Sequence, residues 1–453
     1  LPPPTSAVGD GIPHFEIRDT RPAIWLNLRG RRIQLTGLKK RPRGLLAFFA
    51  IFGPGLIAGA AGNDAGGIAT YSQIGAQFGY EMLWVLVLIT VALALIQEMA
   101  ARLGAATGRG LIELIRLRYG VSWSLLATAI VFVGNTGLVI TEFVGIGAAA
   151  RLLGITPYLV VPLAGLLVWY LVVAGNYPQV EKIFLAMALV FLTYPVAAFL
   201  AHPHWGQVAR GTFVPTFQSN STFLLLMVGI IGTTITPYQQ LFQQSSVVEK
   251  GVARRHYGPE RADVYLGSIF NDLMSAFMII ATAAALHFAG KTNISTAADA
   301  AQALRPVAGN AAKILFAVGL LGASLLAAAV LPLTTAYAVS EVVGLPRGIN
   351  VNFRTGRLFM SVFTGLVIAG IIIALLPGVP VIKLLVLVQV LNGILLPIML
   401  TFILLLVNDK GLMNGLRNTR RYTIAGWVCN GLITASIVVL LGQQLLSAVG
   451  FHL

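Results

Sequence analysis

The sequence predicts an all-α, polytopic membrane protein. Of its 453 residues, 57% are hydrophobic and 10% are charged, and the mean hydropathy is +0.83. The apolar runs are long and rich in Leu, Ile, Val and Ala, and they lack the period-two alternation of membrane β-barrels. Since a membrane helix needs about 20 apolar residues, the chain has room for about ten spans plus loops. This composition excludes a soluble protein.

Apolar runs bounded by charges, Pro or Gly predict eleven membrane helices. They lie near residues 45–79, 82–103, 121–150, 156–175, 181–201, 222–250, 265–289, 309–340, 355–376, 380–407 and 420–447. No linker or low-complexity tract divides the chain. We therefore expect a single transport domain over residues 45–453, preceded by a basic cytoplasmic segment, residues 1–44.

The distribution of basic residues predicts the orientation. With the N-terminus inside, 25 of the 31 lysines and arginines lie on the inner side, as the positive-inside rule expects. We expect a cytoplasmic N-terminus, an external C-terminus and a location in the plasma (inner) membrane. The net charge of +15 has the same origin, because the basic residues lie in short segments between helices and at the N-terminus. The lipid bilayer is therefore an expected partner, and nucleic acid is not.

Enzyme signatures are absent from the sequence. It contains no His-Glu-x-x-His, no Gly-x-Ser-x-Gly and no phosphate-binding glycine loop followed by Lys. We therefore expect no enzymatic activity, no cofactor, and transport powered by a gradient rather than by a nucleotide. The sequence gives no sign of an obligate protein partner, and the single cysteine, Cys429, excludes a disulfide framework.

The first span contains an interruption. Residues 53–71 form an apolar segment with one carboxylate, Asp64, close to Gly66 and Gly67. A charge in hydrocarbon is costly and glycine weakens a helix, so such a break is tolerated only where it lines a cavity. Because freed carbonyls and helix ends can coordinate a cation, Asp64 is the first candidate for a metal-ion ligand.

The sixth span contains a second interruption, within residues 229–238. Pro237 follows three threonines in mid-span, which frees carbonyls upstream and favours an unwound helix. Broken first and sixth helices predict an inverted 5+5 repeat, with one half over about 45–201, the other over about 222–407 and an extra helix over about 420–447. Glycine and proline are common in membrane helices, but a pair of interrupted helices in corresponding halves indicates the substrate site of a transporter.

Few other ionisable residues lie inside the predicted spans. Glu98 and Arg102 are spaced i, i+4 near a cytoplasmic helix end, which favours a structural ion pair. Asp272 and Glu341 lie near cytoplasmic ends, where we expect gating or solvated roles. Glu142 lies in mid-span and needs water, a proton or a basic partner.

Four motifs resemble the Nramp family of divalent-metal transporters. Gly53-Pro-Gly55, followed by Asp64-Ala-Gly-Gly-Ile-Ala-Thr70, is similar to the family's first helix, which carries Asp-Pro-Gly-Asn. Thr236-Pro-Tyr238 falls where the family has Met-Pro-His. Glu142-Phe-Val-Gly145 resembles the third-helix Glu motif, and Gln389-Val-Leu-Asn-Gly-Ile-Leu-Leu-Pro397 resembles the tenth-helix Gln motif. The likeness covers all eleven spans in order. It implies a LeuT-type fold with alternating access and an ion held between the first and sixth helices.

The departures from the family pattern bear on the choice of ion. The family holds its ion with the Asp, the Asn, the Met sulfur and backbone carbonyls; here Asp64 remains, Gly67 replaces the Asn and Thr236 replaces the Met. Loss of the soft thioether removes a preference for transition metals. Mg2+ keeps several waters and is bound through one or two carboxylates, which suits a wider site made of oxygens. The pattern resembles the prokaryotic Nramp-related magnesium transporters, with Mn2+ expected as a second substrate.

The resemblance implies a role for each site residue. Asp64 would coordinate the ion directly or through water, and Thr236 and Gln389 would offer oxygen ligands. The carbonyls of Ala61 and Thr233 would be backbone contacts. Gly67 would provide space rather than ligation, so the ion would be bound with part of its water shell.

Proton coupling is expected to be weak or absent. Val139 and Tyr238 occupy the positions at which family members carry an Asp and a His tied to proton passage. Glu142 remains as a candidate for gating or for a residual proton path. Uptake would then be driven by the membrane potential.

Three other readings stay open on the sequence. One is a proton-coupled transition-metal transporter of the Nramp type for Mn2+ or Fe2+, or a trivalent-metal transporter of the same fold, in which the changes at 67 and 236 are neutral. Another is a LeuT-type symporter of an organic solute, against which stand the ordered motifs on the third and tenth helices. The third is a non-transporting receptor or an ion channel.

Overall fold

The computed structural model describes residues 23–28, 31–36, 62–174, 193–252, 257–302, 309, 312–348, 354–413 and 415–448. Contacts between residues divide the chain into two units, residues 1–51 and residues 52–453. Each unit is described by itself. The predicted ligand Ala61 and the first half of the first predicted span lie outside the described residues.

The first unit contains a β-hairpin that the sequence analysis did not anticipate. Strand β1 (Ala23–Leu28) pairs antiparallel with β2 (Arg31–Thr36), with Ala23 opposite Thr36 and Leu28 opposite Arg31. Only two residues separate the strands, and one of them is Gly30, as two-residue hairpin connections favour. The basic charge of this region concealed its strand pattern.

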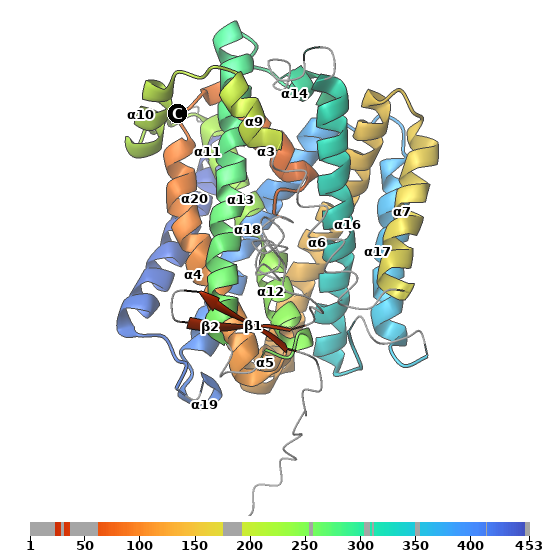
Figure 1. Ribbon diagram of the computed structural model, residues 1–453, viewed down its shortest axis with the longest axis vertical. Coiled ribbons are helices and arrows are strands. Elements are labelled where there is room, and N and C mark those ends of the chain that lie inside the picture. Colours follow the sequence, from red (N-terminus) through yellow and green to blue (C-terminus); the bar gives the residue numbers. More distant parts are fainter. Residues whose placement is uncertain are drawn as a thin grey trace, which may run out of the picture. The chain divides into compact units, whose positions relative to one another are not determined.

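The described part of the second unit is helical (Figure 1). Its elements are α3 (Ala65–Phe78), α4 (Leu83–Thr107), α5 (Leu111–Tyr119), α6 (Val121–Leu152), α7 (Pro157–Ala174), α9 (Thr193–Leu200), α10 (Trp205–Phe213), α11 (Ser221–Thr234), α12 (Pro237–Glu249), α13 (Tyr257–Ala285), η3 (His287–Ala289), α14 (Ala297–Ala301), α16 (Ala312–Val343), α17 (Arg357–Ala374), α18 (Val381–Val407), α19 (Lys410–Met413) and α20 (Arg420–Ala448).

These helices match the predicted spans. Within the described residues, eight helical segments are long and apolar enough to cross a membrane, and α7 is a shorter apolar helix. The predicted sixth span is observed as α11 and α12, separated by Ile235 and Thr236. The predicted spans 45–79 and 181–201 are described only in part, as α3 and α9.

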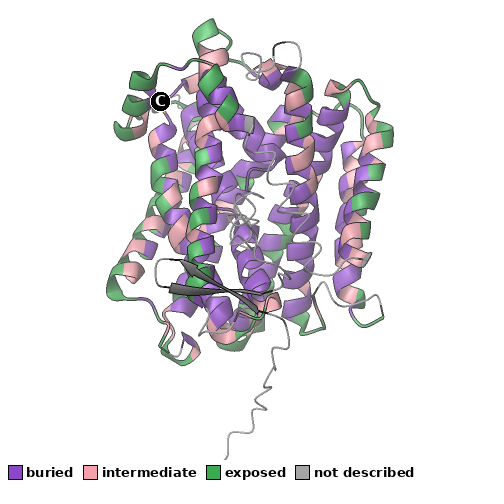
Figure 2. Cartoon of the chain, viewed as in Figure 1, coloured by how far each residue is buried: buried purple, intermediate pink, exposed green. Residues whose placement is uncertain are grey.

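The helices pack in pairs that are distant in sequence. Helix α6 contacts α16 and α17, α11 contacts α18, and α13 contacts α3 and α4. Their inward faces are buried and their outward faces are exposed (Figure 2). The exposed faces carry large apolar side chains such as Val91, Leu166 and Val438, which is the pattern expected of lipid contact.

Glycines bring α11 and α18 into unusually close contact. A Cβ atom on Gly232 would lie 2.8 Å from the Cα atom of Gly393, and one on Gly393 would lie 2.7 Å from the carbonyl oxygen of Val228. Small residues at such interfaces allow the backbones of membrane helices to touch. This contact holds the last turns of α11 beside the segment of α18 that carries Gln389.

Candidate metal-ion site

Asp64 begins the helix that follows the first interruption. It is the N-cap of α3, and its Oδ1 accepts a hydrogen bond of 2.6 Å from the backbone N–H of Gly67. An aspartate at a helix N-terminus satisfies an otherwise unpaired N–H and interacts favourably with the helix dipole. The side chain is fully buried. The sequence therefore places the only carboxylate of this segment at a helix end inside the bundle.

Glu142 supports the same helix start from α6. Its Oε2 accepts a hydrogen bond of 3.1 Å from the backbone N–H of Ala65, the first residue of α3. Two carboxylates thus bind the free N–H groups at one helix N-terminus. For Glu142 we expected water, a proton or a basic partner, and the backbone N–H of Ala65 on α3 is a donor to it.

The second interruption lies between α11 and α12. Pro237 is the first residue of α12, where its missing N–H costs nothing, and the side chain of Gln239 accepts a hydrogen bond of 3.2 Å from the N–H of Thr236. Thr233, Thr236 and Tyr238 are all fully buried. The predicted break in the sixth span is thus a local property of the Thr-Pro sequence.

The two interruptions and α18 meet at Asp64. The Nε2 atom of Gln389 donates a hydrogen bond of 2.8 Å to Asp64 Oδ1. Three buried side-chain oxygens have no hydrogen-bond partner among the described residues: Asp64 Oδ2, Thr233 Oγ1 and Gln389 Oε1. Buried polar atoms without partners are costly, so a group of them around a carboxylate indicates a ligand site.

The glycines beside Asp64 are tightly surrounded. A Cβ atom on Gly67 would lie 2.8 Å from Thr233 Oγ1, 3.0 Å from the carbonyl oxygen of Gly62 and 3.3 Å from Asp64 Oδ1. A Cβ atom on Gly66 would lie 2.9 Å from Gln389 Cδ. The space expected at Gly67 is therefore filled by oxygens of neighbouring residues. We expected the backbone carbonyl of Thr233 to contact the ion, whereas the atom of Thr233 that lies beside Gly67 is its side-chain hydroxyl.

The candidates for gating or a proton path come from two helices, with Val139 and Glu142 on α6 and Tyr238 on α12. Val139 packs against α17, where a Cβ atom on Gly370 would lie 3.0 Å from Val139 Cγ1. Tyr238 lies in the first turn of α12. Asp272 and Glu341 are buried, so the solvated role expected as one alternative is wrong for both, and the gating role stays a prediction. Glu341 accepts hydrogen bonds from the N–H groups of α5, and so it fixes one helix to another.

Sequence reasoning missed a polar network beside Asp64. The amide of Asn63 donates hydrogen bonds to the side chain and the backbone carbonyl of Asn271, at 2.9 and 3.1 Å, and its oxygen accepts one of 2.8 Å from Ser275. Asn271 also donates to Asp272. The signal in the sequence was the buried pair Asn271-Asp272 within an apolar span. This network fixes the chain just before α3 against α13.

Asp64 lies among neutral oxygens, and the second carboxylate at this helix start, Glu142, accepts the N–H of Ala65. Across the described residues, no group of three or more His, Cys, Asp or Glu side chains could hold a metal ion. A hard cation that retains part of its water shell needs only one or two carboxylates, and neutral oxygens can bind its waters.

Solved structures of other proteins share this architecture. The manganese transporter of Eremococcus coleocola, in a variant form, has a TM-score of 0.70 and 20% sequence identity, over 91% of this chain and 90% of that chain. MhsT in complex with L-phenylalanine is similar at a TM-score of 0.56 and 14% identity, over 85% of this chain and 97% of that one. A nucleobase-cation-symport-1 family transporter is similar at 0.52 and 16%, over 86% and 90%. These likenesses establish the LeuT-type fold.

A family model identifies the family of the chain, whereas the structural likenesses show only its fold. The model described as natural resistance-associated macrophage protein-like matches residues 55–443, which include both interruptions, Glu142 and Gln389. The family consists of transporters that move divalent metal ions across membranes, and not of enzymes. This protein belongs to the Nramp family.

Proposed function

We propose that this protein takes up Mg2+, with Mn2+ as a second substrate, as a partly hydrated ion and by alternating access. The observation that carries the proposal is the group of unpartnered oxygens around Asp64, contributed by Asp64, Thr233 and Gln389. These atoms belong to a carboxylate, a hydroxyl and an amide. Hard cations prefer such oxygen ligands, and soft transition metals gain most from a sulfur ligand.

The residue at position 236 supports the same choice of ion. Thr236 stands where the family carries its methionine, and it is buried at the N-cap of α12. A hydroxyl offers a soft ion no advantage over water. The prokaryotic Nramp-related magnesium transporters, which this pattern resembles, are the proposed branch of the family.

Weak or absent proton coupling is part of the proposal. Val139 is apolar and packs against α17, and Glu142 binds the N–H of Ala65. In the family pattern that this chain resembles, the position of Val139 carries an aspartate tied to proton passage. Proton coupling is not required energetically, since a divalent cation gains about 4.6 kcal/mol on crossing an inside-negative potential of roughly 100 mV. That corresponds to more than a thousandfold accumulation.

The proposed setting is the plasma (inner) membrane, with a cytoplasmic N-terminus and an external C-terminus. The excess of Lys and Arg on one side of the spans supports this orientation. In that arrangement α3 ends and α11 and α18 begin on the outside. Ion uptake then proceeds from that side toward Asp64.

The test is uptake into proteoliposomes of Mg2+, Mn2+, Ca2+ and Cd2+ in parallel, with a pH-sensitive dye inside. We expect saturable uptake of Mg2+ and Mn2+ that increases with an inside-negative potential and does not acidify the lumen. Asp64→Ala is the matched inactive variant. Proton-linked Mn2+ uptake that excludes Mg2+ would instead identify a proton-coupled transition-metal transporter.

A further inference from the structure

A cavity lies at the end of α12 that is remote from the second interruption. It has a volume of about 320 Å3, and we call it the inner cavity. In the proposed orientation it faces the cytoplasm, because α11 and α12 together form one span that begins on the outside. Its lining residues come from the start of α5, the last turns of α12 and α16, and the segment after α16: Gly110, Ser245, Val248, Glu249, Tyr337, Glu341 and Arg347.

Two buried oxygens at the inner cavity have no hydrogen-bond partner among the described residues. One is Oε1 of Glu341, which is fully buried and whose ionic contact is with Nε of Arg347 at 3.3 Å. The other is the hydroxyl of Ser245, a residue that is 4% exposed. Buried polar atoms without partners are costly, so two of them at one cavity indicate a ligand site.

The carboxylate of Glu341 is held in place by its other oxygen. Oε2 accepts hydrogen bonds of 3.0 and 3.3 Å from the N–H groups of Ile112 and Glu113, at the start of α5. Gly110 permits this close approach, because a Cβ atom there would overlap the carboxylate. One oxygen of Glu341 is therefore fixed to the backbone, and Oε1 remains for a ligand.

The charges of the inner cavity favour a cation. Glu249 supplies a second carboxylate, whose Oε1 accepts a hydrogen bond of 2.8 Å from Tyr337. Among the described lining residues, these two carboxylates face one positive charge, that of Arg347. Arg347 also pairs with Glu113, with 2.5 Å between Nη2 and Oε2. A cation that replaces Arg347 at Glu341 therefore leaves the guanidinium with a carboxylate partner, which avoids the cost of an unpaired charge.

Polar side chains on α12 connect the inner cavity with the Asp64 site. Thr236, Gln240 and Gln244 recur at intervals of four residues, so they lie on one face of the helix. Gln240 and Gln244 are fully buried, and the amide oxygen of each has no hydrogen-bond partner among the described residues. Ser245 follows Thr236 by nine residues, about 13 Å along a helix. These oxygens can accept hydrogen bonds from the water shell of a passing cation.

We propose that the inner cavity is a second binding site for the transported divalent cation, formed by the carboxylates of Glu249 and Glu341 and the hydroxyl of Ser245. Two carboxylates and a hydroxyl suit a hard cation that keeps part of its water shell. The site receives the ion from Asp64 and releases it to the cytoplasm, and in this direction it rests on the proposed function. Arg347 pairs with Glu341 until the cation replaces it.

Binding of Mn2+ to purified protein tests the site, because electron paramagnetic resonance distinguishes bound from free Mn2+. In Asp64→Ala the first site is removed, and we expect one weaker Mn2+ site to remain. Adding Glu249→Gln should weaken this site by about tenfold or more, since a carboxylate ligand is lost. Adding Arg347→Gln should strengthen it by about threefold, because a competing cation leaves Glu341.

Glu81→Gln in the same Asp64→Ala background is the matched control. Glu81 lies between α3 and α4, is partly buried like Glu249 and does not line the inner cavity. It should leave the binding of Mn2+ unchanged.

Transport provides a second measurement, which depends on the side of the membrane. With Asp64 intact, Glu249→Gln should raise the KM for Mg2+ offered at the cytoplasmic face by about tenfold. The KM at the external face should stay unchanged, because the ion arriving from that side binds Asp64 first. Uptake and efflux in proteoliposomes of a single protein orientation measure the two values. A general structural defect would change both.

The outcomes separate the two proposals. Normal Mg2+ uptake by wild type, combined with no Mn2+ binding by Asp64→Ala, overturns the second site and leaves the proposed function intact. Residual Mn2+ binding that neither Glu249→Gln nor Arg347→Gln alters overturns it as well. Absence of Mg2+ uptake by wild type, together with Mn2+ binding that depends on Glu249 and Arg347, overturns the proposed function and retains the inner cavity as a cation site.

Discussion

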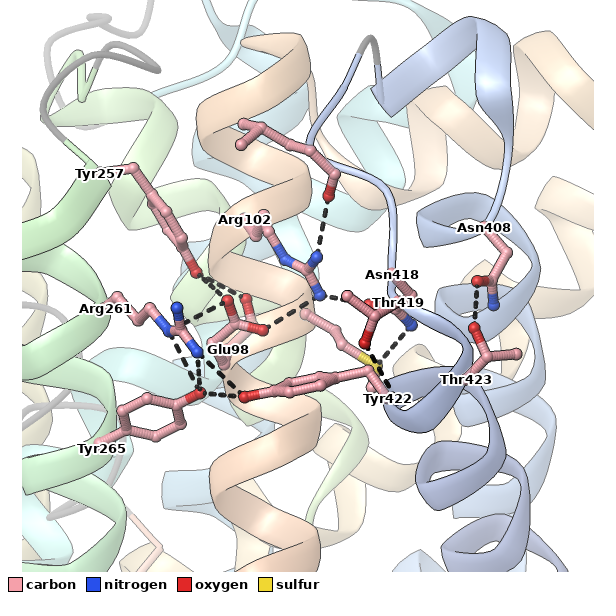
Figure 3. Close-up of polar contacts among 12 residues, drawn as sticks. Glu98, Arg102, Tyr257, Arg261, Tyr265, Asn408, Asn418, Thr419, Tyr422 and Thr423 are labelled. Carbon is pink, nitrogen blue, oxygen red and sulfur yellow. Dashed lines mark hydrogen bonds and ion pairs between the residues drawn. The ribbon is translucent and has the colours of Figure 1, made fainter.

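Two polar regions inside the helical unit differ in how their groups are paired. Around Asp64, one carboxylate faces oxygens that have no partner among the described residues. In the second region, Glu98 of α4 lies between Arg102, at 3.1 Å, and Arg261 of α13, at 3.8 Å, and it accepts a hydrogen bond of 2.9 Å from Tyr257 (Figure 3). Both regions are buried, yet only the second pairs opposite charges.

The paired region, which we call the Glu98 cluster, connects three segments of the chain. Its members are Glu98, Arg102, Tyr257, Arg261, Tyr265, Asn418 and Tyr422 (Figure 3). Arg102 donates to the carbonyl oxygen of Leu416 at 2.8 Å and to the side chain of Asn418. The predicted Glu98–Arg102 ion pair is therefore confirmed, and it extends to α13 and to the start of α20.

The difference between the regions indicates what each is for. A buried charge with complementary partners stabilises one arrangement of helices, and its loss is costly. A buried carboxylate among unpartnered oxygens gains its partner only when a cation arrives. Substitutions in the two regions should therefore affect different measurements.

The largest expected effect is that of Asp64→Ala. Removal of the carboxylate that caps α3 should abolish saturable Mg2+ uptake and leave folding largely intact, because the site holds no ion pair that the change would break. Proteoliposome uptake and thermal unfolding measure the two properties. Asp299→Ala, at an exposed helix cap in α14, is the control. Normal transport by Asp64→Ala would show that the ion binds elsewhere.

Glu98→Ala tests the other side of the comparison. It leaves Arg102 buried without its partner, which should lower the free energy of unfolding by about 3 kcal/mol. The KM for Mg2+ should stay unchanged, since Glu98 lies outside the Asp64 site. Denaturation of the purified protein and uptake by the properly folded fraction test this. A changed ion preference would mean that the cluster takes part in ion selection.

Gly66→Ala should impair transport through geometry alone. The added methyl group would lie 2.9 Å from Gln389 Cδ and displace its amide from Asp64. We expect uptake to fall by about tenfold, or roughly 1.4 kcal/mol. Gly431→Ala on α20 is the matched control, because its Cβ atom would meet nothing within 4 Å. Equal activity of the two variants would show that Gln389 does not contribute to ion binding.

The smallest expected effect concerns ion preference. Gly67→Asn with Thr236→Met should raise affinity for Cd2+ by a few fold, because a thioether is restored. Since Thr233 Oγ1 would lie 2.8 Å from the new Cβ atom, adding Thr233→Ala should increase the gain. Competition of Cd2+ with Mg2+ uptake measures it. If Cd2+ affinity does not rise in either variant, residues beyond those that contact the ion determine selectivity.

The sequence by itself determined the helices, their interruptions and the residue at the centre of the site. Apolar runs of span length and the Thr-Pro break are local signals, so they identified α11, α12 and the membrane class without any tertiary information. Asp64 was identified in the same way, because a charge inside an apolar segment requires a reason. The hairpin of β1 and β2 was missed, since it is short and lies in a basic segment.

Only the tertiary structure decided which atoms surround Asp64. Gln389 is 325 positions away in the sequence, and the orientation of its amide follows from the close packing of α11 on α18 at Gly232 and Gly393. The hydroxyl of Thr233 fills the space beside Gly67, and Glu142 binds the first N–H of α3. Hydropathy predicts whether a residue is buried. Hydrogen bonds between helices depend on atomic positions to within a few tenths of an ångström, and only folding brings those helices together.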